Sequence, residues 1–200
     1  MPQQDAIGIE INTFPLYFKE ISQRPRAVRP AFGGPYLGVR MSDVDQGSLQ
    51  YFQSRACNSQ WAGFLRALAE ELMQQMPVEE LRAFFFVIGG RIATQNPLPG
   101  GASLADLESN ANAYFNKLDW GWVKVRDLQS SLEFAHSCAP LRQAFGDNAL
   151  SWASGLLEGL YATWLRQVGA ANQLELHQIG GAEGAVDTLR FRLAHPSYFA

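Results

Sequence analysis

Few side chains in this sequence have the types and the spacing that metal binding requires. His136 and Cys138 lie two residues apart, which places them on one face of a strand, and imidazole with thiolate is a ligand pair that zinc accepts. Phe134 shares that face and no third ligand accompanies the pair, so the pattern favours a core position for His136. We therefore expect no bound metal and no other cofactor.

Acid–base catalysis needs two partnered groups, and the acidic residues of this chain do not offer a pair. Glu158 lies among leucine and glycine, which predicts a partly buried but solitary carboxylate. His177 and His195 are isolated, and no nucleophile stands in an order typical of a catalytic triad. Tryptophans could stack on sugar rings, but at helical spacing beside leucines they are more typical of a core. The sequence thus favours a non-catalytic assembly protein over a carbohydrate-active enzyme that uses Glu158.

The composition excludes several classes of protein. A net charge of −3 argues against a dedicated nucleic-acid binder, and two cysteines outside any paired motif argue against a disulfide framework. No apolar run approaches the roughly 20 residues of a membrane span, and the first residues lack the pattern of a signal peptide. We expect a cytoplasmic protein. A charged content of 18% with 12% aromatic residues predicts some apolar surface that a partner chain covers.

Residues 1–40 differ from the rest, with a charge of +2 and repeated prolines that preclude a regular fold. Their apolar cluster is typical of a peptide that docks on a partner, and consists of Phe14, Leu16, Tyr17 and Phe18. A disordered tail with chance apolar residues is the alternative. Met41 resembles a natural start, so residues 1–40 are interpreted as an appended or fused segment, and residues 41–200 as one domain.

The most regular stretch is residues 151–168, for which an apolar row every four residues predicts an amphipathic helix: Trp152, Leu156, Leu160 and Trp164. Gly155 and Gly159 lie on a second row of small residues. Glycine inside a helix costs up to about 1 kcal/mol relative to alanine, so a close approach is expected there. The approaching group is predicted to be either the sheet of the same chain or a second subunit.

Other patterns complete the expected order of elements. Helices are predicted over residues 49–75, from Pro77 onward with Leu81, Phe84 and Phe85 on the buried face, and after Ser103 as a cap. Two-residue alternation predicts two hairpins, one over residues 123–136 and one over residues 174–193. The fold class is α+β in the order α-α-α-β-β-α-β-β, with helices on one face of an antiparallel sheet of about four strands.

Three stretches, WAGFLRALAEEL from residue 61, LDWGWVKV from residue 118 and LLEGLYATWL from residue 156, carry a resemblance. Together they resemble the D protein of the bacterial cellulose synthase operon over about residues 41–195. The resemblance implies a non-catalytic accessory subunit that forms octamers from dimers and, with a proline-rich partner, aligns synthase complexes during cellulose secretion. It also implies that glucan chains pass through inner channels, and it would place Arg55, Asn58 and Gln60 at their lining.

A second resemblance is to the small-molecule-binding domains related to 4-vinyl reductase and the vesicle-tethering Bet3 proteins. It rests on the same succession of helices, hairpin, Leu-Glu-Gly-Leu helix and hairpin. Such sensor domains carry a cysteine pair in the last hairpin, and LHQIGGAEGAVDTLRF has none. A sensor or tethering domain is therefore kept as the alternative function.

Overall fold

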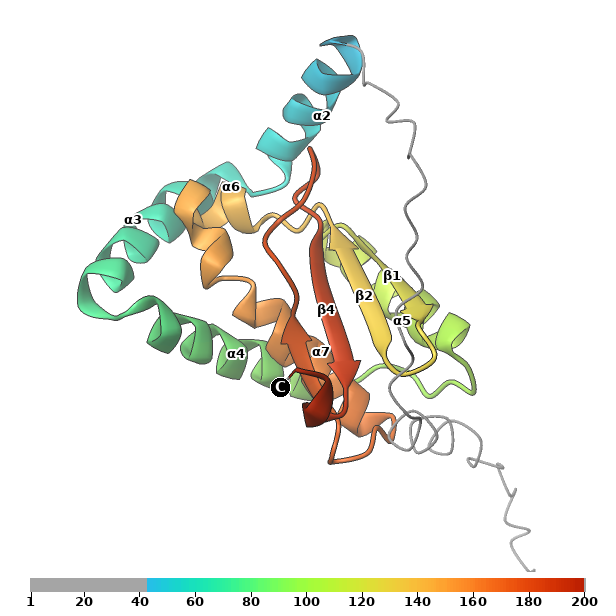
Figure 1. Ribbon diagram of the computed structural model, residues 1–200. Coiled ribbons are helices and arrows are strands. Elements are labelled where there is room, and N and C mark those ends of the chain that lie inside the picture. Colours follow the sequence, from blue (N-terminus) through green and yellow to red (C-terminus); the bar gives the residue numbers. More distant parts are fainter. Residues whose placement is uncertain (1–42, 200) are drawn as a thin grey trace, which may run out of the picture.

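The computed structural model describes residues 43–199 (Figure 1). The helices are α2 Asp43–Arg55, α3 Ser59–Gln75, α4 Val78–Gln95, α5 Leu104–Leu118, α6 Leu141–Phe145 and α7 Gly155–Gln167, with 3-10 helices η1 Asp147–Ser151 and η2 Pro196–Tyr198. The strands are β1 Trp122–Asp127, β2 Leu132–Ser137, β3 Glu175–Gln178 and β4 Leu189–Ala194. The α+β class is confirmed. The predicted docking cluster, Phe14 to Phe18, lies outside the described residues.

The four strands form one antiparallel sheet in the order β1-β2-β4-β3. Both predicted hairpins are present, and β2 pairs with β4 to join them, so that Phe134 lies opposite Phe191. The β1 edge is covered by α5, because Asn112 accepts from Val123 N at 2.8 Å and donates to Val123 O at 2.9 Å. Side chains thus satisfy backbone groups that an edge strand would otherwise expose.

The single helix predicted over residues 49–75 is divided into α2 and α3. Asn58 interrupts it, because its backbone is extended and its side chain accepts a hydrogen bond from Gln60 N, which caps the start of α3. The predicted starts of the next helices are present as well. Ser103 and Asp106 form a complete capping box at α5, and Pro77 precedes the first turn of α4.

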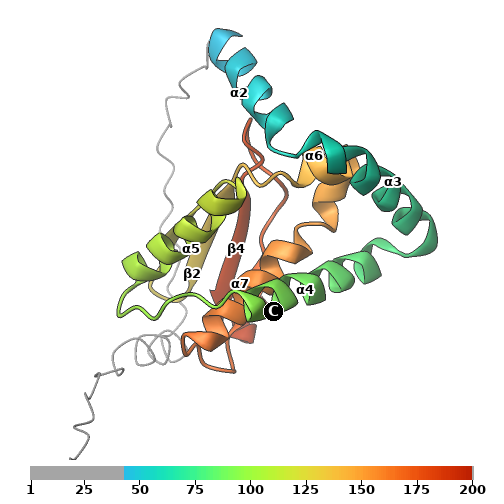
Figure 2. The same ribbon diagram turned by 180° about the vertical axis from the view of Figure 1, so that it is seen from behind.

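Helix α7 lies at the centre of the molecule, between the sheet and α4 (Figures 1 and 2). Its predicted start at residue 151 is wrong: Ser151 ends η1 and α7 begins at Gly155. The short helix α6 was not predicted, because five residues are too few to show helical periodicity. Tyr161 packs on the sheet beside Phe134 and Phe191, with ring centroids 5.3 and 5.7 Å away.

The glycines of α7 allow it to approach α4 at backbone distance. A Cβ at Gly159 would lie 1.9 Å from Phe86 O, and one at Gly155 would lie 2.5 Å from Arg82 O. Gly89 of α4 is the reciprocal case, since its Cβ would lie 1.9 Å from Leu156 O. The close approach was predicted, but its partner was not. The two α7 glycines face α4 of the same chain instead of the sheet or a second subunit.

Candidate assembly surface

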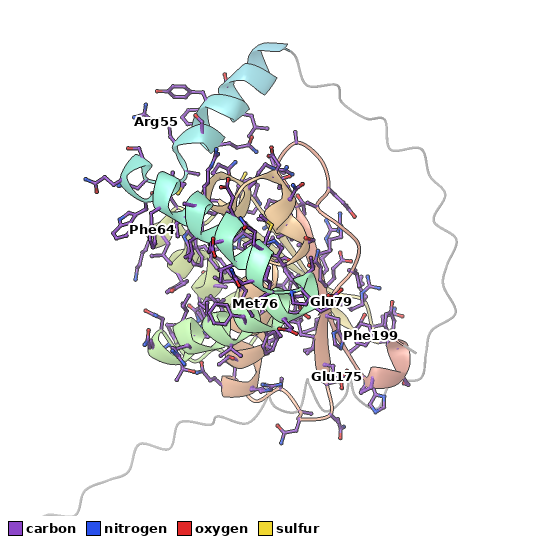
Figure 3. All side chains as sticks on the ribbon, turned by 90° about the vertical axis from the view of Figure 1, so that its left-hand side faces the viewer. Arg55, Phe64, Met76, Glu79, Glu175 and Phe199 are labelled. Atoms are coloured by element: carbon purple, nitrogen blue, oxygen red, sulfur yellow. The ribbon has the colours of Figure 1, made fainter. Side chains whose placement is uncertain are left out.

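Helices α2 and α3 present large apolar side chains that nothing in the described structure covers. Their exposed fractions are 55% for Tyr51, 69% for Phe52, 59% for Trp61 and 58% for Phe64, while Leu68 is 38% exposed. Trp61, Phe64 and Leu68 share one face of α3, because they are spaced by three and four residues. We call these five residues the α2–α3 apolar surface. Figure 3 shows Phe64 on the outside of the molecule, in line with Arg55 of α2.

This surface forms because α3 packs through its opposite face. Ala69 is fully buried, and Leu72 and Met76 contact the core at the far end of the helix. The polar residues of the row do not compensate, since Arg66 and Glu70 are themselves exposed. Exposed apolar rows of this kind mark sites of protein–protein contact. The sequence prediction of an apolar surface is thereby confirmed.

Helix α4 extends the exposed apolar area beyond the α2–α3 apolar surface. Phe84 was predicted to be buried, yet it is 45% exposed, and Val87 is 58% exposed. The face that α4 turns towards α7 consists of Leu81, Phe85 and Gly89, which recur every four residues. Phe84 is one residue away from this row and so points about 100° around the helix. Gly89 is the sequence signal that could have identified the packed face.

The residues predicted to line a glucan channel gather at the junction between α2 and α3. Arg55 ends α2, Asn58 caps α3 and Gln60 belongs to its first turn, and all three are exposed. The Arg55 guanidinium lies 5.4 Å above the ring of Tyr51 and donates to its hydroxyl at 3.2 Å. Channel lining by these residues stays a prediction. What the structure gives is a shared, accessible position beside the α2–α3 apolar surface.

A cavity of about 250 Å³ lies between α2 and the body, and Phe52, Gln53, Trp122 and Cys138 are among its lining residues. Gln53 ties α2 across it by donating to Ala185 O at 2.8 Å. Burial, together with the nearby Asp187 charge, raises the pKa of the Cys138 thiol. The thiolate form that a nucleophile requires is therefore disfavoured at neutral pH.

The buried ionisable groups have structural roles. His136 is fully buried: one ring nitrogen contacts Trp120 O at 2.7 Å and the other contacts the Tyr161 hydroxyl at 2.6 Å. Burial lowers the pKa of His136 to about 4, so the ring is neutral, donating to Trp120 O and accepting from Tyr161. The predicted core position is confirmed. Within residues 43–199, no three His, Cys, Asp or Glu side chains are grouped to hold a metal ion.

The fold and its surface define an α+β protein with an apolar face typical of proteins that bind other proteins, and the comparisons identify its family. The family model for the D subunit of cellulose synthase matches residues 47–192. The chain belongs to this cellulose synthase family, which gives it an accessory role in cellulose synthesis. None of the helices in residues 43–199 is both long and apolar enough to cross a bilayer.

The relatives that match are proteins named cellulose synthase operon protein D. One from Komagataeibacter xylinus is 27% identical over 104 residues, which cover 51% of this chain and 67% of the relative. One from Komagataeibacter sucrofermentans is 28% identical over the same length and shares.

A solved structure with a partial likeness is trafficking protein particle complex subunit 3 from Naegleria fowleri, covalently bound to palmitic acid. It is 14% identical, with a TM-score of 0.45, over 73% of this chain and 96% of that chain. A score below 0.5 does not establish a shared fold, so the palmitic acid remains a property of that protein.

Proposed function

We propose that this chain is a non-catalytic scaffold protein of bacterial cellulose synthesis that self-associates, as dimers that build a ring-like octamer. The ring would organise synthase complexes or guide glucan chains so that separate glucans crystallise together. A proline-rich protein of cellulose synthesis is the proposed partner, and the cytoplasm is the proposed location, which cell fractionation tests.

The observation that carries the proposal is the α2–α3 apolar surface. Burying one large apolar side chain contributes roughly 1.5–3 kcal/mol. Covering Trp61, Phe64 and Leu68 in one contact would therefore contribute several kcal/mol, which is on the scale of a micromolar association even after the entropic cost of assembly. Family membership supplies the process, and the exposed surface supplies a means of assembly.

Guidance of glucan would take place at the α2–α3 junction, where Arg55, Asn58 and Gln60 are accessible. Their guanidinium and amide groups match the hydroxyl groups of a neutral sugar chain as donors and acceptors. Assembly through the adjacent apolar surface would bring several such junctions around one axis. Residues 1–40 are proposed to dock on a partner through the Phe14 to Phe18 cluster.

Replacement of Phe64 by Asp tests assembly, because a carboxylate cannot be buried in an apolar contact without a large desolvation cost. Light scattering after size-exclusion chromatography should give a lower mass for Phe64→Asp, and particle images should lose the ring. Leu128→Asp is the matched control, since Leu128 is an exposed apolar residue of the β1–β2 turn at 38% exposure. An unchanged mass for Phe64→Asp, or an equal loss in the control, would contradict the proposal.

A further inference from the structure

A second, polar cleft of about 530 Å³ opens between α4, α7 and the loop after β3. Its lining includes Arg82 of α4, Glu158 of α7, His177 and Gln178 of β3 and the loop residues 180–182. None of these belongs to the α2–α3 apolar surface or to the Arg55 junction. Ligand pockets typically measure about 300–1,000 Å³, so the cleft is large enough for part of an oligomeric ligand.

The floor of the cleft is a charge-balanced ion pair. Glu158 is only 6% exposed, and the Arg82 guanidinium donates to one of its carboxylate oxygens. Arg82 also donates to Ser154 Oγ at 2.8 Å and to Gln178 Oε1 at 3.0 Å. A solitary buried carboxylate would cost several kcal/mol, so Arg82 offsets that cost and the floor has no net charge. Glu158 is therefore neither a free acid nor a free anion.

Polar capacity remains at the wall of the cleft. The other Glu158 oxygen is 3.7 Å from His177 Nδ1, which is too long for a hydrogen bond. The His177 side chain is 49% exposed, and its ring packs edge-on against Phe199 with centroids 4.6 Å apart. The Gln178 amide donates one hydrogen to Gly180 O at 2.9 Å and has a second to offer. A hydroxyl group placed here would meet an acceptor and donors at once.

The rim formed by the loop after β3 is open. A Cβ built on Gly180 or Gly181 meets no heavy atom within 4 Å, so the backbone there is accessible. Phe199 and Leu150 add apolar area near and within the same cleft. Planar polar side chains beside limited apolar area suit a sugar ring, which is apolar on its faces and carries hydroxyl groups at its edge.

The balance of charge selects the class of ligand. An anion would find Arg82 already neutralised by Glu158, and a cation would find Glu158 neutralised by Arg82. We propose that this cleft binds a neutral, hydroxyl-rich ligand, namely a segment of β-linked glucan. The choice of glucan over other hydroxylated ligands rests on the proposed function. The site is separate from the α2–α3 junction and would provide each copy of the chain with its own glucan contact.

The test uses the full chain and cellopentaose, followed by saturation-transfer NMR and by calorimetric titration into the millimolar range. Saturation transfer to the sugar is expected for cellopentaose, and transfer to maltopentaose, which has α-linkages, should be much weaker. His177→Ala should weaken binding at least fivefold, because it removes the exposed wall without touching the ion pair. Gln75→Ala, at an exposed polar residue of α3, is the matched control and should bind as the unaltered chain does.

Several results would overturn the inference. They are the absence of transfer, equal transfer from maltopentaose, unchanged binding by His177→Ala, or displacement of the sugar by sulfate, which would indicate an anion site. Unfolding temperatures of both variants exclude a loss of fold as the cause. A chain that assembles through Phe64 but does not bind cellopentaose would leave the proposed scaffold function standing, whereas normal binding without assembly would contradict the scaffold alone.

Discussion

Replacing Gly159 by alanine should destabilise the fold by forcing α4 and α7 apart. The new Cβ would lie 1.9 Å from Phe86 O and 2.7 Å from Phe86 C, whereas real Cβ contacts essentially never fall under 3.0 Å. The atoms in the way are backbone, so α4 itself must move by about 1 Å. Overpacking of this kind costs typically 1–3 kcal/mol, which the gain of about 1 kcal/mol in helix propensity only partly offsets at the upper end.

The matched control is Gly63→Ala on α3, which makes the same change at a helix interior. No heavy atom lies within 4 Å of a Cβ built on Gly63, so only the propensity gain of about 0.5–1 kcal/mol remains. Urea unfolding monitored by circular dichroism should therefore move the two midpoints in opposite directions. In thermal unfolding, each kcal/mol corresponds to about 2–4 °C for a domain of this size.

The reasoning would be refuted by a Gly159→Ala variant as stable as the unaltered chain, or one that gains stability as Gly63→Ala does. Gly159→Leu should be worse than Gly159→Ala, because three further carbons would enter the same helix contact. A variant that folds normally but fails to assemble would instead indicate that Gly159 contributes to a contact between copies of the chain.

Three further predictions concern single groups. The folded pKa of His136, about 4, is below its ordinary value of 6.5, so this residue's contribution to stability is complete above pH 6.5 and is lost as the pH falls towards 4. The loss should reach about 3 kcal/mol in urea midpoints and be absent in His136→Gln, and a flat profile would contradict it. Asn112→Ala should cost about 1–3 kcal/mol and speed hydrogen exchange at Val123 N, which Asn112 now bonds; unchanged exchange would count against it. Ser103→Ala should cost about 1 kcal/mol through loss of the α5 cap, measured by thermal unfolding, and an unshifted midpoint would show that Asp106 suffices alone.

Local patterns in the sequence were enough to predict most elements. The alternation around Val123 and Phe134 predicted β1 and β2, and Ser103 with Asp106 predicted the start of α5, because each signal lies within a few residues of the feature it specifies. The division between α2 and α3 was missed. It depends on one cap residue, Asn58, in a stretch whose apolar spacing continues across the break.

Which surface each helix buries was not predictable in the same way. Leu81 and Phe84 have similar apolar character, yet Leu81 is fully buried and Phe84 is 45% exposed. The difference arises because α7 approaches α4 at Gly89, a contact between residues far apart in the chain. Similarly, Glu158 could be recognised as a buried carboxylate, whereas its partner Arg82 is 76 residues away.

Neighbouring residues alone were sufficient to specify the period of each element, the order of helices and hairpins, and the family resemblance. Contacts between distant segments, which appear only in the folded chain, place the α7 glycines against α4 and leave the α2–α3 apolar surface uncovered. They also bring Arg82 and Glu158 into one cleft. Periodicity specifies an apolar face without specifying what covers it, because coverage is set by segments that the pattern does not contain.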